Sequence, residues 1–149
     1  MRNLKKIALV GTLSALFALS AAASQTIVAY EIGNSPYFIG NGAPGSTITL
    51  TASLRNPNNH AQVIGSKNEW CMITSYSPGP ILYCDESLVF NAGGSLFAHG
   101  YIDEVALEHF APQTISVYKG AGIYAGKTGT ETIQQVVFPN ELLNTLVIN

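Results

Sequence analysis

One carboxylate interrupts a mostly apolar stretch near the start of the chain, residues 26–32. Alternation of side chains predicts a strand there, with Glu31 on the same face as Ile27 and Ala29. Because its other members are apolar, we expect that face to point into the protein. A carboxyl group in an apolar interior has a raised pKa. The alternative is an exposed carboxylate at the start of a strand.

Cys71 and Cys84 are the only cysteines. The turn-forming residues 77–80 (Ser-Pro-Gly-Pro) lie midway between them. A hairpin centred on this turn places the two cysteines opposite each other, close enough to bridge. In an exported protein, such a pair predicts a disulfide rather than a metal site or a catalytic thiol.

Other polar residues give weaker signals for chemistry. The histidines are far apart in sequence and lack the spacing of metal ligands, so we predict no metal site. The adjacent acids Asp85 and Glu86 point to opposite faces of a strand and cannot serve one site together. The three histidines are His60, His99 and His109.

Glycines concentrate in residues 120–129, which contain four of them. No helical pattern follows this loop, so it is not a phosphate-binding loop. Its composition predicts a tight β-turn. Ser35 lies in no nucleophile elbow, so we predict no hydrolase serine.

The first 23 residues have the layout of a secretory signal peptide. A basic head precedes the apolar run 7–19, and small residues at 21–23 indicate cleavage just after Ala23. We therefore expect a secreted or periplasmic protein with one domain, residues 24–149. The apolar run is too short for stable membrane insertion, since a spanning helix needs about 20 residues.

Without the leader, four basic residues face nine acidic ones, a formal charge of −5 with neutral histidines. This balance argues against binding nucleic acid, whose phosphates require basic partners. It also argues against an electrostatic attraction to anionic lipid.

Short β-rich segments separated by turn residues predict an all-β protein with eight antiparallel strands. Residues 103–110 fit a short helix or a loop equally well. Eight strands close into a barrel that holds packed side chains or one small ligand. An outer-membrane barrel is the alternative, but several segments are shorter than the 9–11 residues its strands need. The expected strands are residues 26–32, 46–54, 69–76, 81–90, 95–102, 113–119, 130–138 and 142–148.

Five segments, in order along the chain, resemble plant allene oxide cyclases. The most specific is the run at 133–139 (Ile-Gln-Gln-Val-Val-Phe-Pro), which follows the glycine-rich 120–126. The others are 30–32, 35–36 and 90–100. The glycine part is shared by the wider allene oxide cyclase/dirigent barrel superfamily.

The resemblance implies an eight-stranded barrel, trimeric in the plant enzymes, that needs no cofactor. Those enzymes close an unstable fatty-acid allene oxide to a cyclopentenone, with the barrel acting as a mould. Glu31 matches a glutamate near the reacting carbons. Ser35 and Pro36 match members of a polar cluster that holds a water against the epoxide oxygen.

The chain departs from the family pattern at several of these positions. The family asparagine two residues after the glutamate is Gly33 here, and Asn34 replaces it only if the register shifts. A second family asparagine falls near Ser53. A family tyrosine corresponds to Tyr101 after a one-residue slip, or is lost at Ile102.

The remaining expected pocket residues are Cys71 and Leu82. Cys71 matches a pocket cysteine of the family, whereas Cys84 stands where the plant enzymes have a small residue. An inward-facing disulfide would narrow the barrel.

Two functions therefore stay open. One is an isomerase that cyclises an apolar epoxide or a related polyene. The other is a non-catalytic, dirigent-like or lipocalin-like barrel that binds a small hydrophobic molecule.

Overall fold

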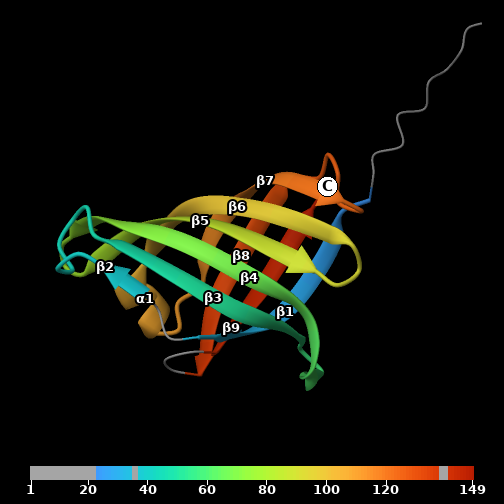
Figure 1. The fold of residues 1–149 in the computed structure, drawn as a ribbon, viewed down its shortest axis with the longest axis horizontal. Coiled ribbons are helices and arrows are strands. Elements are labelled where there is room, and N and C mark those ends of the chain that lie inside the picture. Colours follow the sequence, from blue (N-terminus) through green and yellow to red (C-terminus); the bar gives the residue numbers. More distant parts are fainter. Residues whose placement is uncertain (1–22, 35–36, 138–140) are drawn as a thin grey trace, which may run out of the picture.

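The structure is a computed structural model and describes residues 23–34, 37–137 and 141–149. Consecutive strands pair with one another and form an antiparallel barrel (Figure 1). The strand order is β1-β9-β8-β7-β6-β5-β4-β3, and β3 pairs with β1 to close the ring. The elements are β1 (Gln25–Gly33), β2 (Tyr37–Ile39), β3 (Thr47–Asn56), β4 (Asn59–Tyr76), β5 (Pro80–Phe90), β6 (Gly94–Asp103), α1 (Glu104–Glu108), β7 (Gln113–Gly122), β8 (Gly129–Val137) and β9 (Glu141–Ile148).

Closure of the barrel takes place at β1. Glu31 lies opposite Leu142 of β9 on one side and opposite Leu54 of β3 on the other. The short β2 pairs only with the start of β3, beyond the end of β1. Eight strands thus form the ring, and the predicted eight-stranded antiparallel barrel is confirmed.

Two segments differ in detail from the sequence-based expectation. The strand expected at residues 69–76 is β4, which begins at Asn59. Its first half pairs with β3 and continues the β3–β4 hairpin after a tight turn at 57–58. The ambiguous segment at 103–110 contains the helix α1. Asp103 caps this helix by accepting a hydrogen bond from the Ala106 backbone N–H at 3.0 Å.

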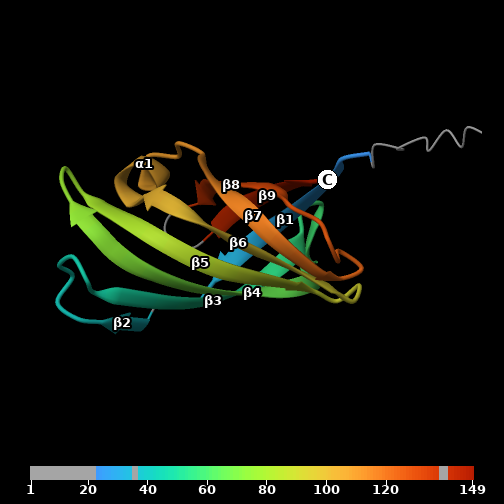
Figure 2. The same ribbon diagram turned by 90° about the horizontal axis from the view of Figure 1, so that it is seen from above.

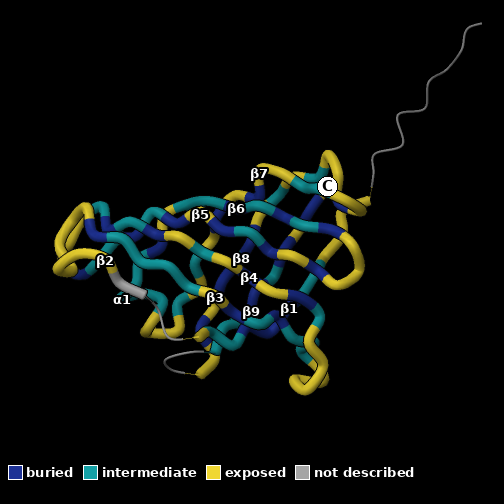
Figure 3. The backbone as a smooth tube through the Cα atoms, in the orientation of Figure 1, coloured by how far each residue is buried: buried dark blue, intermediate teal, exposed yellow. Residues whose placement is uncertain are grey.

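The two ends of the barrel differ. Figures 1 and 2 show α1, β2 and the β4–β5 turn at one end, with the C-terminus at the other. Buried and exposed residues alternate along the strands between exposed loops (Figure 3). Within the described residues, no helix has the length and apolar character needed to cross a membrane.

The end that lacks α1 is packed with apolar side chains, among them Leu54, Leu88, Phe90, Leu96, Leu146 and Ile148.

The glycine-rich stretch connects β7 to β8, as predicted. Gly122 has a φ of +63° as the chain enters the turn, a conformation that favours glycine. Tyr124 at the turn packs edge-on against Phe90, with ring centroids 5.6 Å apart. The stretch therefore covers the apolar end of the barrel and takes no part in the site. The predicted leader, apart from its last residue Ala23, lies outside the described residues.

Candidate functional site

A cavity of about 260 Å³ occupies the end of the barrel next to α1. Side chains from five of the barrel strands form its apolar wall, and Leu107 of α1 also lines it. Its polar lining includes three inward-facing charged residues, Glu31, Lys67 and Glu69, and the buried amide of Gln135. The site is thus an apolar cup with charged groups inside the barrel. The apolar wall consists of Ile48, Leu50, Leu82, Ile102, Ile133 and Leu142.

Lys67 is the centre of a buried ionic cluster. Its side chain is 1% exposed, and its Nζ lies 3.2 Å from Glu31 Oε2, 3.0 Å from Glu69 Oε2 and 2.7 Å from Glu86 Oε2. The fourth carboxyl, Glu131 of β8, is fully buried nearby and contributes to the electrostatic field at Lys67. One ammonium group therefore faces four carboxyl groups away from water. Such burial is unfavourable for any carboxylate that stays unpaired.

Strand register explains why the carboxyls crowd together. Glu69 and Glu86 are direct cross-strand partners on the inner face of β4 and β5, where like charges repel. Burial raises the pKa of Glu69 to about 7, although the attraction of Lys67 opposes this. Burial also raises the pKa of Glu86 well above its usual range, and contact with Glu131 adds to the rise. Burial raises the pKa of Glu131 as well.

The raised pKa values of Glu69, Glu86 and Glu131 imply that the cluster holds protons at neutral pH. The attraction of the surrounding carboxylates raises the pKa of Lys67 well above its usual value against the opposing effect of burial, so the amine stays charged. With one cation available, the remaining carboxyls lower their burial cost by binding protons. Glu69 is the member that reaches the cavity with some exposure, 11% of its side chain.

Glu31 points into the barrel, as its face predicts, and is fully buried. Its surroundings are not apolar, contrary to expectation. Asn144 Nδ2 donates a 2.7 Å hydrogen bond to Oε2, the same oxygen that Lys67 approaches. The other oxygen, Oε1, is buried and has no hydrogen-bond partner among the described residues. Glu31 thus lines the cavity with one oxygen held and the other unpaired.

Several predicted site residues do line the cavity. Leu82 and Cys71 belong to its wall. Asn34 lies at its rim, where its amide donates a 3.0 Å hydrogen bond to Thr51 Oγ1. Ser35 and Pro36 lie outside the described residues.

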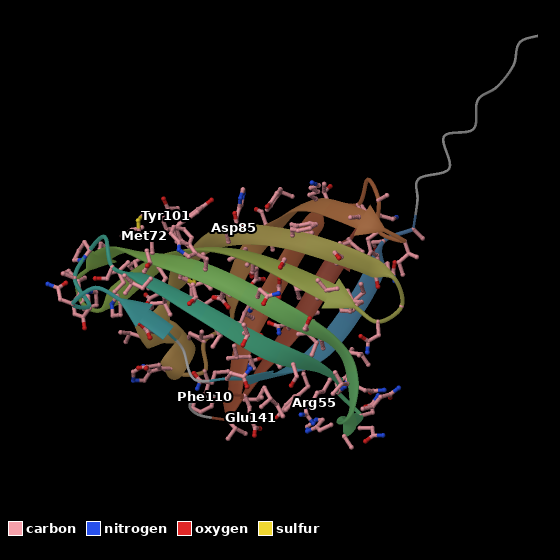
Figure 4. The ribbon with its side chains drawn as sticks, in the orientation of Figure 1. Arg55, Met72, Asp85, Tyr101, Phe110 and Glu141 are labelled. Atoms are coloured by element: carbon pink, nitrogen blue, oxygen red, sulfur yellow. A yellow bond between two sulfur atoms is a disulfide. The ribbon has the colours of Figure 1, made fainter. Side chains whose placement is uncertain are left out.

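Two predicted positions are wrong. Tyr101 is 64% exposed and points away from the barrel (Figure 4), while its neighbour Ile102 lines the cavity. The one-residue slip considered for Tyr101 is therefore incorrect. Ser53 also faces outward, where it accepts a 3.2 Å hydrogen bond from Arg55 Nε, and Ala52 takes the inward position. Neither side chain can contact a ligand inside the barrel.

The cluster residues were missed because an isolated charged residue on a predicted strand is usually solvated. A signal was nevertheless present. Side chains two residues apart on a strand share a face, so an inward Cys71 implies inward Glu69 and Lys67. By the same rule, an inward Cys84 implies an inward Glu86.

Cys71 and Cys84 form the predicted disulfide, with their Cα atoms 4.0 Å apart. Both sulfurs are buried inside the barrel, so the bridge forms part of the cavity's surroundings. Glu69 lies close to both sulfurs, but a bonded pair offers no thiolate to a metal ion. The bridge also indicates an oxidising compartment.

Loss of this disulfide is expected to lower the free energy of unfolding by about 2–3 kcal/mol, because the short loop between the cysteines is freed in the unfolded chain. Urea unfolding of a Cys71→Ser/Cys84→Ser variant measures this loss. Thiol titration of the wild-type protein should find no reactive thiol without reductant. Two accessible thiols in the oxidised protein would contradict the bridge.

No protein-family model and no curated protein sequence matches the chain. Solved structures do share its fold. A pyocyanin demethylase superposes with a TM-score of 0.70 at 20% identity, over 84% of this chain and 100% of that one. AbnU, an exo-specific intermolecular Diels-Alderase, gives 0.70 at 15% identity, over 85% and 98%. The pterocarpan synthase dirigent protein PsPTS1 gives 0.66 at 13%, over 85% and 94%.

At these identities the likeness establishes the barrel fold and not an activity. The expectation of a barrel like those of cyclases and dirigent proteins is thereby confirmed at the level of fold. Membership of the allene oxide cyclase branch stays a prediction.

Proposed function

We propose that this protein is a barrel cyclase that binds a small apolar epoxide or related polyene and directs its ring closure. One observation carries the proposal: a cavity with apolar walls ends on a fixed carboxylate, Glu31, inside a closed barrel. Two of the structurally similar proteins are named as an exo-specific Diels-Alderase and a pterocarpan synthase dirigent protein, which is compatible with a role of this fold in ring-forming chemistry.

The apolar walls supply orientation. A flexible polyene bound against Ile48, Leu82 and Leu142 has fewer folded conformations than in water. Restricting the reacting ends to one approach favours one stereoisomer and lowers the entropic part of the barrier. The cavity volume lies near the lower end of the range for small-molecule sites, so a long chain would extend through the open end.

Glu31 supplies charge at a fixed position. Lys67 and Asn144 hold its Oε2, which leaves Oε1 free toward positive charge that develops on the ligand. A preoriented charge in a site of low polarity stabilises a developing opposite charge without reorganisation. This role suits a reaction that passes through a delocalised carbocation.

Purified protein incubated with freshly generated fatty-acid allene oxide tests the proposal. Chiral chromatography should show one cyclopentenone enantiomer in excess, whereas the spontaneous reaction is racemic. A racemic product at the spontaneous rate would remove this substrate class from the proposal.

Glu31→Gln should lower the rate of stereoselective cyclisation at least about tenfold, equal to about 1.4 kcal/mol of lost transition-state stabilisation. Glutamine keeps the shape and an acceptor for Asn144 but removes the charge. Asp85→Asn on the outer face of the barrel is the matched control and should leave the rate unchanged. Full activity of Glu31→Gln would remove Glu31 from the mechanism.

A second candidate is a dirigent-like barrel that binds an apolar molecule without catalysis. The outward position of Ser53 and the glycine at 33 favour it, because two side chains expected to hold a water against the epoxide are missing from the cavity. Saturable binding of a long-chain enone by wild-type and Glu31→Gln proteins alike, without cyclisation of the allene oxide, would support this candidate.

A further inference from the structure

The carboxyl cluster around Lys67 contains more ionisable groups than the proposed role of Glu31 uses. We propose that Glu69 is the proton donor of the site, that it protonates an oxygen atom of the bound ligand, and that Lys67 stabilises the carboxylate left behind. The inference rests on the proposed function and specifies its substrate class: the ligand carries an epoxide or carbonyl oxygen at the charged end of the cavity.

Position selects Glu69 within the cluster. It lines the cavity and is 11% exposed, whereas Glu86 and Glu131 are buried behind it. Its neighbour Glu31 is also at the cavity, but its Oε2 accepts a hydrogen bond from Asn144 as well as contacting Lys67, whereas Oε2 of Glu69 contacts only Lys67 among the described residues. Only Glu69 therefore combines access to a ligand with an environment that favours the protonated acid.

The contacts of Glu69 also favour a proton on its carboxyl group. Oε1 lies 3.0 Å from Cys71 Sγ, and a disulfide sulfur has no hydrogen to donate. The sulfur therefore donates no hydrogen bond that would stabilise the carboxylate form of Glu69. The protonated form gives up no hydrogen bond at this contact. Oε2 lies 3.0 Å from Lys67 Nζ, which favours the carboxylate once the proton has left.

Every charged group that faces Glu69 affects this balance. Lys67 on its own strand attracts the carboxylate, while Glu86 of β5 and Glu31 of β1 repel it. Glu131 of β8 lies further along the same cluster, and two acids of α1 line the open end of the cavity. Those two acids are Glu104 and Glu108. Burial, Glu86 and Glu31 thus act together to keep the proton on Glu69, and Lys67 opposes them.

The unpaired Oε1 of Glu31 is independent evidence that a ligand belongs here. This oxygen is buried and lacks a partner among the described residues, as do the oxygens of Glu86 and Glu131, but of these three residues only Glu31 lines the cavity. A ligand that becomes positively charged beside Glu31 after receiving a proton from Glu69 would satisfy it. The two glutamates then act on the same molecule, one as acid and the other as fixed anion.

The step balances without another reactant. The Glu69 proton passes to the epoxide oxygen as one C–O bond breaks, which leaves a hydroxyl-bearing pentadienyl cation. One C–C bond forms between the ends of this cation and closes the five-membered ring. The hydroxyl proton returns to Glu69 as the ketone forms, so the reaction is an isomerisation and the acid is regenerated.

A stable ligand tests the proton donor without turnover. An alkyl-substituted cyclopentenone serves as the probe, and the infrared stretch of its carbonyl is followed between pH 5 and pH 9. In the wild-type complex the band should move to higher frequency as pH rises, because Glu69 stops donating a hydrogen bond. In Glu69→Gln the band should not titrate, because the amide donates at every pH. Asp85→Asn should behave like the wild type.

Activity supplies the second readout. Glu69→Gln should cyclise the allene oxide about 100-fold more slowly, within the usual contribution of a general acid. A bound probe whose band does not titrate, or titrates equally in Glu69→Gln, would overturn Glu69 as the donor and leave the cavity proposal standing. Failure of the wild-type protein to bind the probe would overturn both.

Discussion

Replacement of Lys67 by methionine should lower the free energy of unfolding by about 3–5 kcal/mol at pH 8, the range seen when one partner of a buried ion pair is removed. The side chain is 1% exposed and has three carboxyl groups within 3.2 Å of its Nζ. Methionine fills a similar volume, so the loss comes from charge and not from a cavity. The carboxylates left behind have no other cation inside the barrel among the described residues.

The size of this loss should depend on pH. At pH 5 the carboxyls of the variant can take up protons, so the difference from wild type should shrink. Urea unfolding at both pH values measures it. Lys127→Met in the β7–β8 turn is the matched control, with an expected change of no more than about 0.5 kcal/mol. Equal losses for Lys67→Met at pH 5 and pH 8 would show that packing, and not charge, accounts for the effect.

Wild-type stability should itself fall by about 3 kcal/mol as pH rises from about 4.5 to about 8, from Glu69 alone. The pKa of Glu69 is raised to about 7 in the folded protein from an ordinary value of 4.5. In that pH window the folded protein binds a proton that the unfolded chain has lost, so raising the pH favours unfolding. The raised pKa values of Glu86 and Glu131 act in the same direction.

Urea unfolding at half-unit steps between pH 4.5 and pH 8 checks this dependence. Glu69→Gln should flatten the curve, since glutamine does not titrate. Asp85→Asn changes a carboxyl on the outer face and should keep the slope of the wild type. A stability that rises across this window in the wild-type protein would mean that the cluster is held together as charged pairs without bound protons.

Most of the fold followed from patterns that are local in sequence. Alternating residues predicted the inward face of Glu31, and turn residues at 77–80 placed Cys71 opposite Cys84. The first ten residues of β4 were missed, because only Val63 and Ile64 among residues 59–68 have the branched or aromatic side chains typical of strands. Pairing with β3 imposes the strand there.

Errors in the predicted site came from register. A shift of one residue on a strand moves a side chain to the opposite face. This single step separates Tyr101, outside the barrel, from Ile102 in the cavity wall. The same step separates Ser53 from the inward-facing Ala52. A resemblance aligned to within one residue is therefore sufficient for the fold and insufficient for the site.

By itself the sequence determined an antiparallel barrel, an inward Glu31 and a disulfide across one hairpin, because each depends on alternation or on a turn. Only the tertiary structure decided what surrounds that glutamate. Lys67, Glu86 and Glu131 come from three strands, and barrel closure brings them together around a point that no local pattern specifies. Glu31 consequently lies in a proton-rich ionic cluster beside an apolar cavity, because burial places four carboxyls around one ammonium group.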